Sequence, residues 1–130
     1  MRAYKTPLAI LILIALALGL AYFTSPARRT TVRVDAAIKQ LDREIAKAPS
    51  GLTSNPYDYA RSSPAFHAFS SLDRSAVPIL AARIARSRQN GLREYLWALA
   101  AENLRSDNGA KDRISFSSAG DWLQQYYQHQ

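Results

Sequence analysis

The side chains that could do chemistry are few and far apart in this chain of 130 residues. His67 could serve as a metal ligand or a general base, but the second histidine, His129, lies near the C-terminus, and zinc sites need three or four ligands at one point. Cysteine is absent, which excludes disulfides, thiolate metal sites and thiol nucleophiles. We therefore interpret His67 as a partly buried structural residue and expect neither a metal nor a cofactor.

The carboxylates nearest the expected core belong to Asp58, Asp73, Glu94 and Glu102. A carboxylate pair hydrolyses glycosidic bonds only where a cleft holds the substrate, and two helical hairpins seldom form one. We expect Glu94 to bond a nearby loop or a helix N-terminus. None of the adjacent serine pairs lies in a G-x-S-x-G turn, and their positions are typical of helix caps. These pairs are Ser62–Ser63, Ser70–Ser71 and Ser117–Ser118. The sequence predicts no catalytic site; a small envelope hydrolase is the alternative.

Five arginines gather around one expected helical hairpin: Arg74, Arg83, Arg86, Arg88 and Arg93. Arg83 and Arg86 are three residues apart and therefore share a helix face. Together with a net charge of +7, the cluster predicts a surface for an acidic protein partner or for anionic lipid. The alternative is a solvated face whose long side chains cover apolar surface. No nucleic acid partner is expected for a domain outside the cytoplasm.

The N-terminal segment 1–24 is the part of the sequence that predicts the cellular compartment of these side chains. Residues 8–23 form sixteen positions without a charge, about 24 Å as a helix, and counting from Tyr4 to Thr24 reaches the length needed to span a bilayer of ~30 Å. Tyr4, Tyr22 and Phe23 would then stand where membrane proteins carry an aromatic belt. The segment is predicted to be a transmembrane anchor.

A cleavable signal peptide is the competing interpretation of the same segment. Arg2 and Lys5 would form its basic start, and small residues at 19 and 21 or at 25 and 27 could precede a cleavage site. Charges flank both sides of the apolar run, so orientation depends on the long C-terminal part. We expect N-in/C-out insertion in a bacterial inner membrane with the soluble domain extracytoplasmic; a cytoplasmic domain, or a secreted or periplasmic one, is the alternative.

The polar residues 25–31 are expected to form a short link, and residues 31–48 an amphipathic helix capped by Thr30 or Thr31. One stripe of that helix is apolar and should pack on the domain. Residues 49–61 contain Pro, Gly and Asn breakers and are expected to form a loop, which Tyr57 and Tyr59 pin to the following helices. The stripe consists of Val34, Ile38, Leu41 and Ile45.

Four further helices are expected at 62–72, 75–88, 91–105 and 119–128. Ser62 or Ser63, then Ser75, then Ser117 or Ser118 would cap three of them. The expected buried side chains are Phe66, Phe69 and Leu72; Val77, Leu80, Ala81, Ile84 and Ala85; Leu92, Tyr95, Leu96, Leu99, Ala100 and Asn103; and Trp122, Leu123 and Tyr126. No run of residues alternates as a strand would.

Three short motifs stand out between about residues 55 and 126: Asn55-Pro56-Tyr57, then Ala76, Pro78 and Leu80, then Asn90, Gly91, Leu92, Glu94 and Tyr95. With these motifs, this part of the chain resembles small bacterial HEAT-like helical modules. Val77 stands where that pattern usually has Ile, and the last helix fits more loosely. The resemblance implies a scaffold for binding and supplies no catalytic residues.

These observations predict an all-α chain, in which an N-terminal transmembrane or signal helix precedes a HEAT-like bundle of about five helices. The expected parts are an anchor or signal peptide at 1–24, a link and amphipathic helix at 25–48, and the helical domain at 49–130. The expected function is a membrane-anchored extracytoplasmic protein-interaction module without catalytic activity. Its expected partners are the membrane, crossed once, and another envelope protein.

Overall fold

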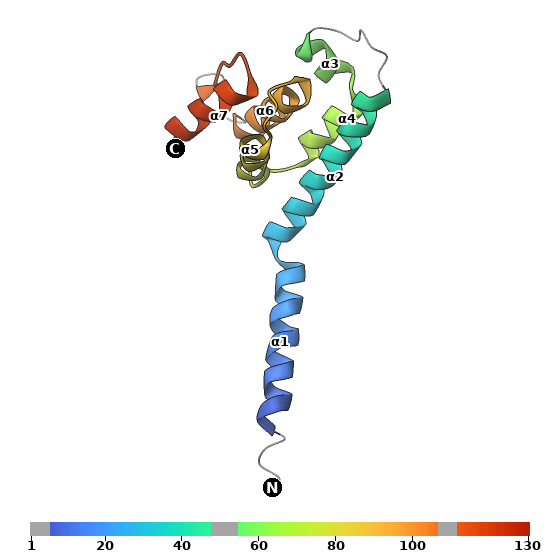
Figure 1. The fold of residues 1–130 in the computed structure, drawn as a ribbon, viewed down its shortest axis with the longest axis vertical. Coiled ribbons are helices and arrows are strands. Elements are labelled where there is room, and N and C mark those ends of the chain that lie inside the picture. The colour runs from blue at the N-terminus through green and yellow to red at the C-terminus, as the bar shows by residue number, and fades with distance from the viewer. Residues whose placement is uncertain (1–5, 48–54, 107–111) are drawn as a thin grey trace.

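The computed structural model describes residues 6–47, 55–106 and 112–130, and these residues form helices joined by short connections, without strands. The first helix, α1, extends away from the domain, and the second helix, α2, runs along one side of the cluster formed by the remaining helices (Figure 1). The helical segments are α1 (Thr6–Thr24), α2 (Pro26–Lys47), α3 (Pro56–Ser62), α4 (Pro64–His67), the short 3₁₀ helix η2 (Ala68–Ser71), α5 (Ala76–Arg86), α6 (Leu92–Arg105) and α7 (Ala119–Gln128).

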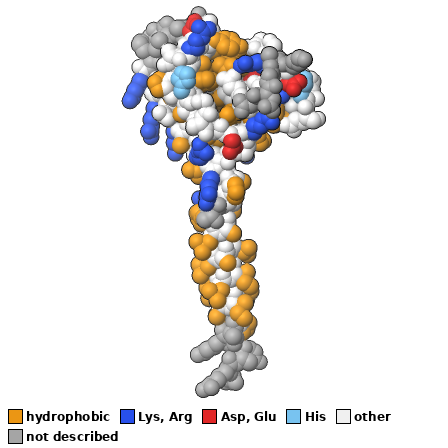
Figure 2. Space-filling model, turned by 180° about the vertical axis from the view of Figure 1, so that it is seen from behind, with side chains coloured by type: hydrophobic (Ala, Val, Ile, Leu, Met, Phe, Trp, Pro, Cys, Tyr) orange, Lys and Arg blue, Asp and Glu red, His pale blue; other side chains and the backbone are white. Residues whose placement is uncertain are grey.

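Helix α1 is apolar on every face. Its large side chains from Leu8 to Leu20 are each 50–66% exposed, and Figure 2 shows them as a continuous hydrophobic shaft. Within the described residues, no single helix combines the length and the hydropathy expected of a membrane span. The helices Pro7–Phe23 and Pro26–Lys47 reach that expectation only as a pair, with a bend of 46° between them.

The link predicted at 25–31 is wrong, because α2 begins at Pro26 and only Ser25 interrupts the two helices. Ser25 Oγ accepts a hydrogen bond from Arg28 N at 3.3 Å, and Pro26 occupies the first helical position, where its missing N–H costs nothing. The predicted caps Thr30 and Thr31 lie inside the helix. Their hydroxyls donate to the carbonyls one turn earlier.

The apolar stripe predicted for α2 is confirmed. Val34 and Leu41 are fully buried, and Ile38 and Ile45 are partly buried against the same core. Helix α2 packs against α4, η2, α5 and α6. It therefore shares one hydrophobic core with the rest of the helical domain.

The loop predicted at 49–61 is wrong in its second half, where α3 forms; residues 48–54 lie outside the described residues. Asn55 accepts a hydrogen bond from Tyr57 N at 3.0 Å, and Pro56 is the first helical residue. The Asn-Pro pair that resembled a breaker is thus an N-cap followed by proline. Tyr59 bonds to α2, which precedes it, and Tyr57 packs edge-on against Tyr95 of α6.

The predicted helix 62–72 is observed as α4 followed by η2, and Ser63 caps it through Phe66 N at 2.9 Å. The expected burial of Phe66, Phe69 and Leu72 is confirmed. In α5, Ser75 precedes the helix but makes no capping bond, because its hydroxyl donates to Asp73 instead. The helix ends at Arg86, two residues before the predicted end, and Ala85 is exposed rather than buried.

Helix α6 lies among α2, α3, η2, α5 and α7, and it is buried on more sides than its stripe predicts. Asn103, expected inside, is exposed, whereas Trp97 and Glu102 are buried. Helix α7 matches its predicted bounds. Ser118 caps it by accepting from Asp121 N at 3.1 Å, and Trp122 is fully buried as expected.

Candidate functional site

A groove of about 410 Å³ lies between α6 and the segments α3, α4 and η2. Its floor is apolar, since the Phe66 and Phe69 rings stand 6.2 Å apart and face Leu99 of α6. Ser63 caps α4, which carries Phe66, and η2 follows directly and carries Phe69; both rings are buried. The lining consists of Tyr57, Ala60, Arg61, Phe66, His67, Phe69, Ser70, Leu72, Leu99, Ala100, Asn103, Leu104 and Arg113.

The rim of this groove carries Arg61 and Arg113, and none of the lining residues in the described part of the chain is an acid. Arg113 Nη2 donates to Asn103 Oδ1 at 2.7 Å, which holds one guanidinium at the edge. The His67 ring lies 3.0 Å from the Arg61 carbonyl. The Arg61 guanidinium is exposed and makes no hydrogen bond or ion pair within the described part of the chain.

The sequence pattern did not reveal this groove. The large apolar residues of its floor were predicted only as core. The space between them exists because the positions beside them, Ala60, Ser70 and Ala100, carry small side chains. Small residues at contact positions were the available signal, but they indicate a groove only once the facing helices are known.

The predicted arginine surface divides into bound and free side chains. Arg83 Nη2 pairs with Asp35 Oδ1 of α2 at 2.5 Å. Arg93 pairs with Glu94 at 3.1 Å, lies 3.6 Å from an Asp42 oxygen of α2, and stacks 4.9 Å over the Trp97 ring. These contacts fasten α5 and α6 to α2.

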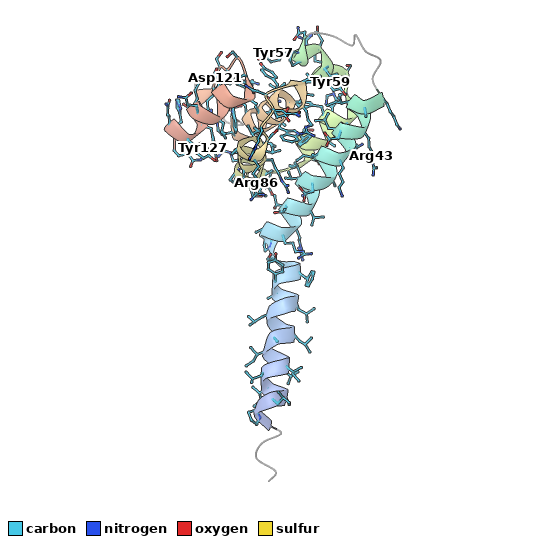
Figure 3. All side chains as sticks on the ribbon, in the orientation of Figure 1. Arg43, Tyr57, Tyr59, Arg86, Asp121 and Tyr127 are labelled. Carbon is cyan, nitrogen blue, oxygen red and sulfur yellow. The ribbon has the colours of Figure 1, made fainter. Side chains whose placement is uncertain are left out.

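Arg74 donates to the Arg105 carbonyl at 2.9 Å and so joins the start of α5 to the end of α6. Arg86 and Arg88 are exposed, and neither makes a hydrogen bond or an ion pair within the described residues; Figure 3 labels Arg86 on α5. A partner-binding surface therefore stays a prediction, with Arg86 and Arg88 as its available cations.

Glu102 is a fully buried carboxylate that joins three segments. It accepts two bonds from Arg105 (2.8 and 3.0 Å), one from the Trp122 indole (2.9 Å) and one from Ile114 N (2.8 Å). Burial alone would raise the pKa of this carboxyl, but the four donated bonds and the Arg105 charge outweigh it and hold the pKa below 4.5. Its oxygens are occupied, so its role is structural.

Glu94 caps α6, as predicted for a helix N-terminus. Its carboxylate accepts from Gly91 N at 3.2 Å and from Ser87 Oγ at 2.8 Å. Burial opposes the charge of Glu94, yet the bonds from Ser87, the backbone and Arg93 keep its pKa lowered.

Glu44 of α2 was missed as a structural residue. It accepts from Tyr59 Oη at 2.8 Å, from Ala65 N at 3.1 Å and from the Ser63 hydroxyl. Burial and the neighbouring Glu44 carboxylate raise the pKa of Tyr59 to about 12. The only sequence signal was its position beside the apolar stripe of α2.

The junction of α1 and α2 holds a second basic feature. The Arg28 guanidinium lies 4.1 Å above the Phe23 ring and 5.2 Å from the Tyr22 ring. A hollow of about 310 Å³ is lined there by Phe23, Arg28, Arg29, Val32 and Arg33. Arg33 also donates to the Ser71 carbonyl at 2.8 Å, which attaches the start of α2 to η2.

The histidines do not form a site. His67 is exposed rather than partly buried as predicted, and the His129 ring lies 2.7 Å from the Gln125 carbonyl. Among the described residues, no three His, Cys, Asp or Glu side chains stand together in a way that could hold a metal ion. Comparison of the chain with protein-family models, with curated proteins and with solved structures finds no match.

Proposed function

We propose that this protein is a membrane-anchored helical interaction module of the bacterial envelope, with its domain on the extracytoplasmic side and without catalytic activity. The observation that carries the proposal is the exposure of α1. Its large apolar side chains are at least half exposed around the whole helix, and burying them in lipid would remove the cost of contact with water. A helix of 19 residues is about 28 Å long, close to the hydrocarbon thickness of ~30 Å.

The α1–α2 junction supports the same proposal. Tyr22 and Phe23 lie near the C-terminal end of α1, and the guanidinium of Arg28, from the start of α2, lies over their rings. Aromatic rings followed by arginine are typical of a helix that leaves a membrane through the headgroup layer. Ser25, the single residue between α1 and α2, accepts a hydrogen bond from Arg28 N, and with so short a connection the domain would stand close to the lipid surface.

The inventory of the domain supports binding over catalysis. Glu44, Glu94 and Glu102 each accept at least three hydrogen bonds, including at least one from outside their own helix, which leaves them engaged in holding the fold together. The helical domain is proposed to be HEAT-like, since α5 packs against both α6 and α7 as stacked helical pairs would.

The test is the intact mass of the chain recovered from carbonate-washed bacterial membranes. We expect a mass that includes Met1, or formyl-Met1, in the membrane fraction. A soluble protein that begins near residue 22 or 28 would overturn the anchor in favour of the periplasmic or secreted alternative. Protease added to intact spheroplasts should digest the domain; full protection would overturn the extracytoplasmic placement.

A further inference from the structure

We propose that the groove between α6 and the α3–α4–η2 segment binds an acidic peptide segment carrying one or two bulky apolar side chains. This inference rests on the proposed interaction function and names the chemistry of its partner. The groove differs from the arginine surface predicted from sequence, because Arg61 and Arg113 lie outside that set.

The floor determines the apolar half of the ligand. Phe66, Phe69 and Leu99 line it from opposite sides, and about 410 Å³ is enough for a leucine or phenylalanine side chain with part of its backbone. Tyr57 borders the groove and packs edge-on against Tyr95, yet it remains 47% exposed, so its exposed part can contact an inserted side chain. Such a side chain would lose its contact with water on binding.

The rim determines the charge of the ligand. Among the described residues, the lining contains two arginines, Arg61 and Arg113, and no acid, so a cationic segment would meet like charge and an acidic one opposite charge. The Arg61 guanidinium has no hydrogen-bond or ion-pair partner among the described residues, so it can rotate onto a carboxylate without breaking a bond to them. Arginine suits this role because its planar donors bind a carboxylate in pairs.

A peptide fits better than a lipid because of where the Arg61 end of the groove lies. The Tyr59 hydroxyl binds α3 to Glu44, near the end of α2 that is farther from α1. About 27 Å of helix separates Glu44 from Pro26. Lipids of a bilayer that holds α1 would therefore lie on the opposite side of the domain from Arg61, as the separation of α3 and α1 in Figure 1 shows.

The experiment titrates the full chain, in nanodiscs of zwitterionic lipid, with a fluorescein-labelled hexapeptide that has two acidic residues on each side of a Leu-Phe pair. Fluorescence anisotropy reports peptide binding, and co-purification with the nanodisc separately reports anchoring. If the chain stays outside the nanodiscs, the anchor fails, and the same titration in neutral detergent still tests the groove.

Two pairs of variants locate the binding. Arg61→Glu removes a rim cation that has no partner among the described residues, and Arg43→Glu makes the same charge change at an exposed position of α2 outside both the groove and the predicted arginine surface. Ser70→Trp places a ring in the groove, whereas Ser71→Trp places it on the neighbouring exposed residue, which does not line the groove. Both serine hydroxyls donate to the carbonyl three residues earlier, so each pair member loses a comparable bond.

We expect Arg61→Glu and Ser70→Trp each to weaken peptide binding about tenfold or more, with Arg43→Glu and Ser71→Trp within about twofold of the unaltered chain. Binding should weaken with added salt, and a peptide with lysine in place of the acids should not bind. Absence of binding, or equal loss in both members of a pair with unchanged circular dichroism, overturns the proposal. So does groove-dependent binding of dihexanoyl phosphatidylglycerol in place of the peptide.

Discussion

Helices α1 and α2 follow one another in the chain and have similar lengths, 19 and 22 residues, yet they are buried in different ways. In α1 nearly every residue is apolar, and the large side chains stay exposed on all sides. In α2 just over half of the residues are polar, and one apolar stripe runs along a single face, where Val34, Ala37 and Leu41 are buried. The difference teaches that placement within the domain follows the spacing of apolar residues rather than their number.

The physical reason is the geometry of packing. A domain core accepts one stripe of a helix at its edge and leaves the remaining faces in water. A helix that is apolar all round needs an apolar environment all round, which this domain does not offer. The apolar side chains of α2 thus meet their apolar surroundings in the protein core, whereas those of α1 are proposed to meet them in lipid.

The largest effect should come from placing charge on α1. The double change Leu13→Arg with Leu16→Arg puts two guanidinium groups near the middle of the helix, at a cost of roughly 5 kcal/mol for insertion in lipid. We expect the full chain to lose flotation with liposomes while its domain keeps its circular dichroism. Leu13→Ala with Leu16→Ala should still float; unchanged flotation of the arginine variant would contradict a lipid-inserted α1.

The next largest effect should come from Glu102→Gln in the domain. It removes the charge that the Arg105 guanidinium pairs with and one of the acceptors used by Ile114 and Trp122, which should lower the free energy of unfolding by about 4 kcal/mol. Urea unfolding followed by circular dichroism measures it. Asp58→Asn, on the exposed face of α3, should change stability by less than about 0.5 kcal/mol.

A direct contrast of the two helices uses the same substitution in each. Leu41→Ala removes a fully buried side chain of α2 and should cost the domain about 3 kcal/mol through lost burial and the cavity left behind. Leu13→Ala, on α1, should leave domain unfolding unchanged, because that side chain is 65% exposed. Equal losses in the two variants would show that α1 is part of the folding unit.

Acid should destabilise the domain and spare α1. The folded-state pKa of Glu44, Glu94 and Glu102 is lowered from 4.5, so their stabilisation is present above that value and is lost as the pH falls through the lower folded values. The segment Thr6–Thr24 has no carboxylate side chain. We expect the melting temperature of the domain to decrease as the pH is lowered below about 4.5, whereas flotation of the chain with liposomes stays unchanged. The Glu102→Gln variant should show a shallower pH dependence; an equal slope would argue against this origin.

The smallest effect should come from the Arg83–Asp35 pair. Both side chains are about one-third to two-fifths exposed, so solvent screens the attraction. A double-mutant cycle with Arg83→Gln and Asp35→Asn should give a coupling of about 0.5 kcal/mol that diminishes with salt. Arg86→Gln with Asp35→Asn should show no coupling, since Arg86 has no recorded partner among the described residues.

The buried side of a helix was predicted from the sequence more accurately for helices that are buried on one face than for the helix that is buried on several faces. The stripe of α2 and the bounds of α7 were predicted, because each helix rests on the core by one face. Helix α6 lies among five other segments, so no single stripe of apolar residues marks its buried side. Asn103 was therefore predicted to be buried, whereas the structure buries its neighbour Glu102 instead. Helix α3 was taken as a loop because Asn-Pro occurs both in turns and at helix starts.

The sequence by itself determined the all-α fold, the apolar helix at the N-terminus and the face by which α2 joins the core, since these depend on the spacing of neighbouring residues. Only the tertiary structure decided which charges are engaged. Arg83 meets Asp35 across 48 positions, and Glu102 collects donors from three segments. The groove likewise arises only where α3, η2 and α6 come together. Such contacts depend on how helices stack, because residues far apart in the chain carry no local pattern that pairs them.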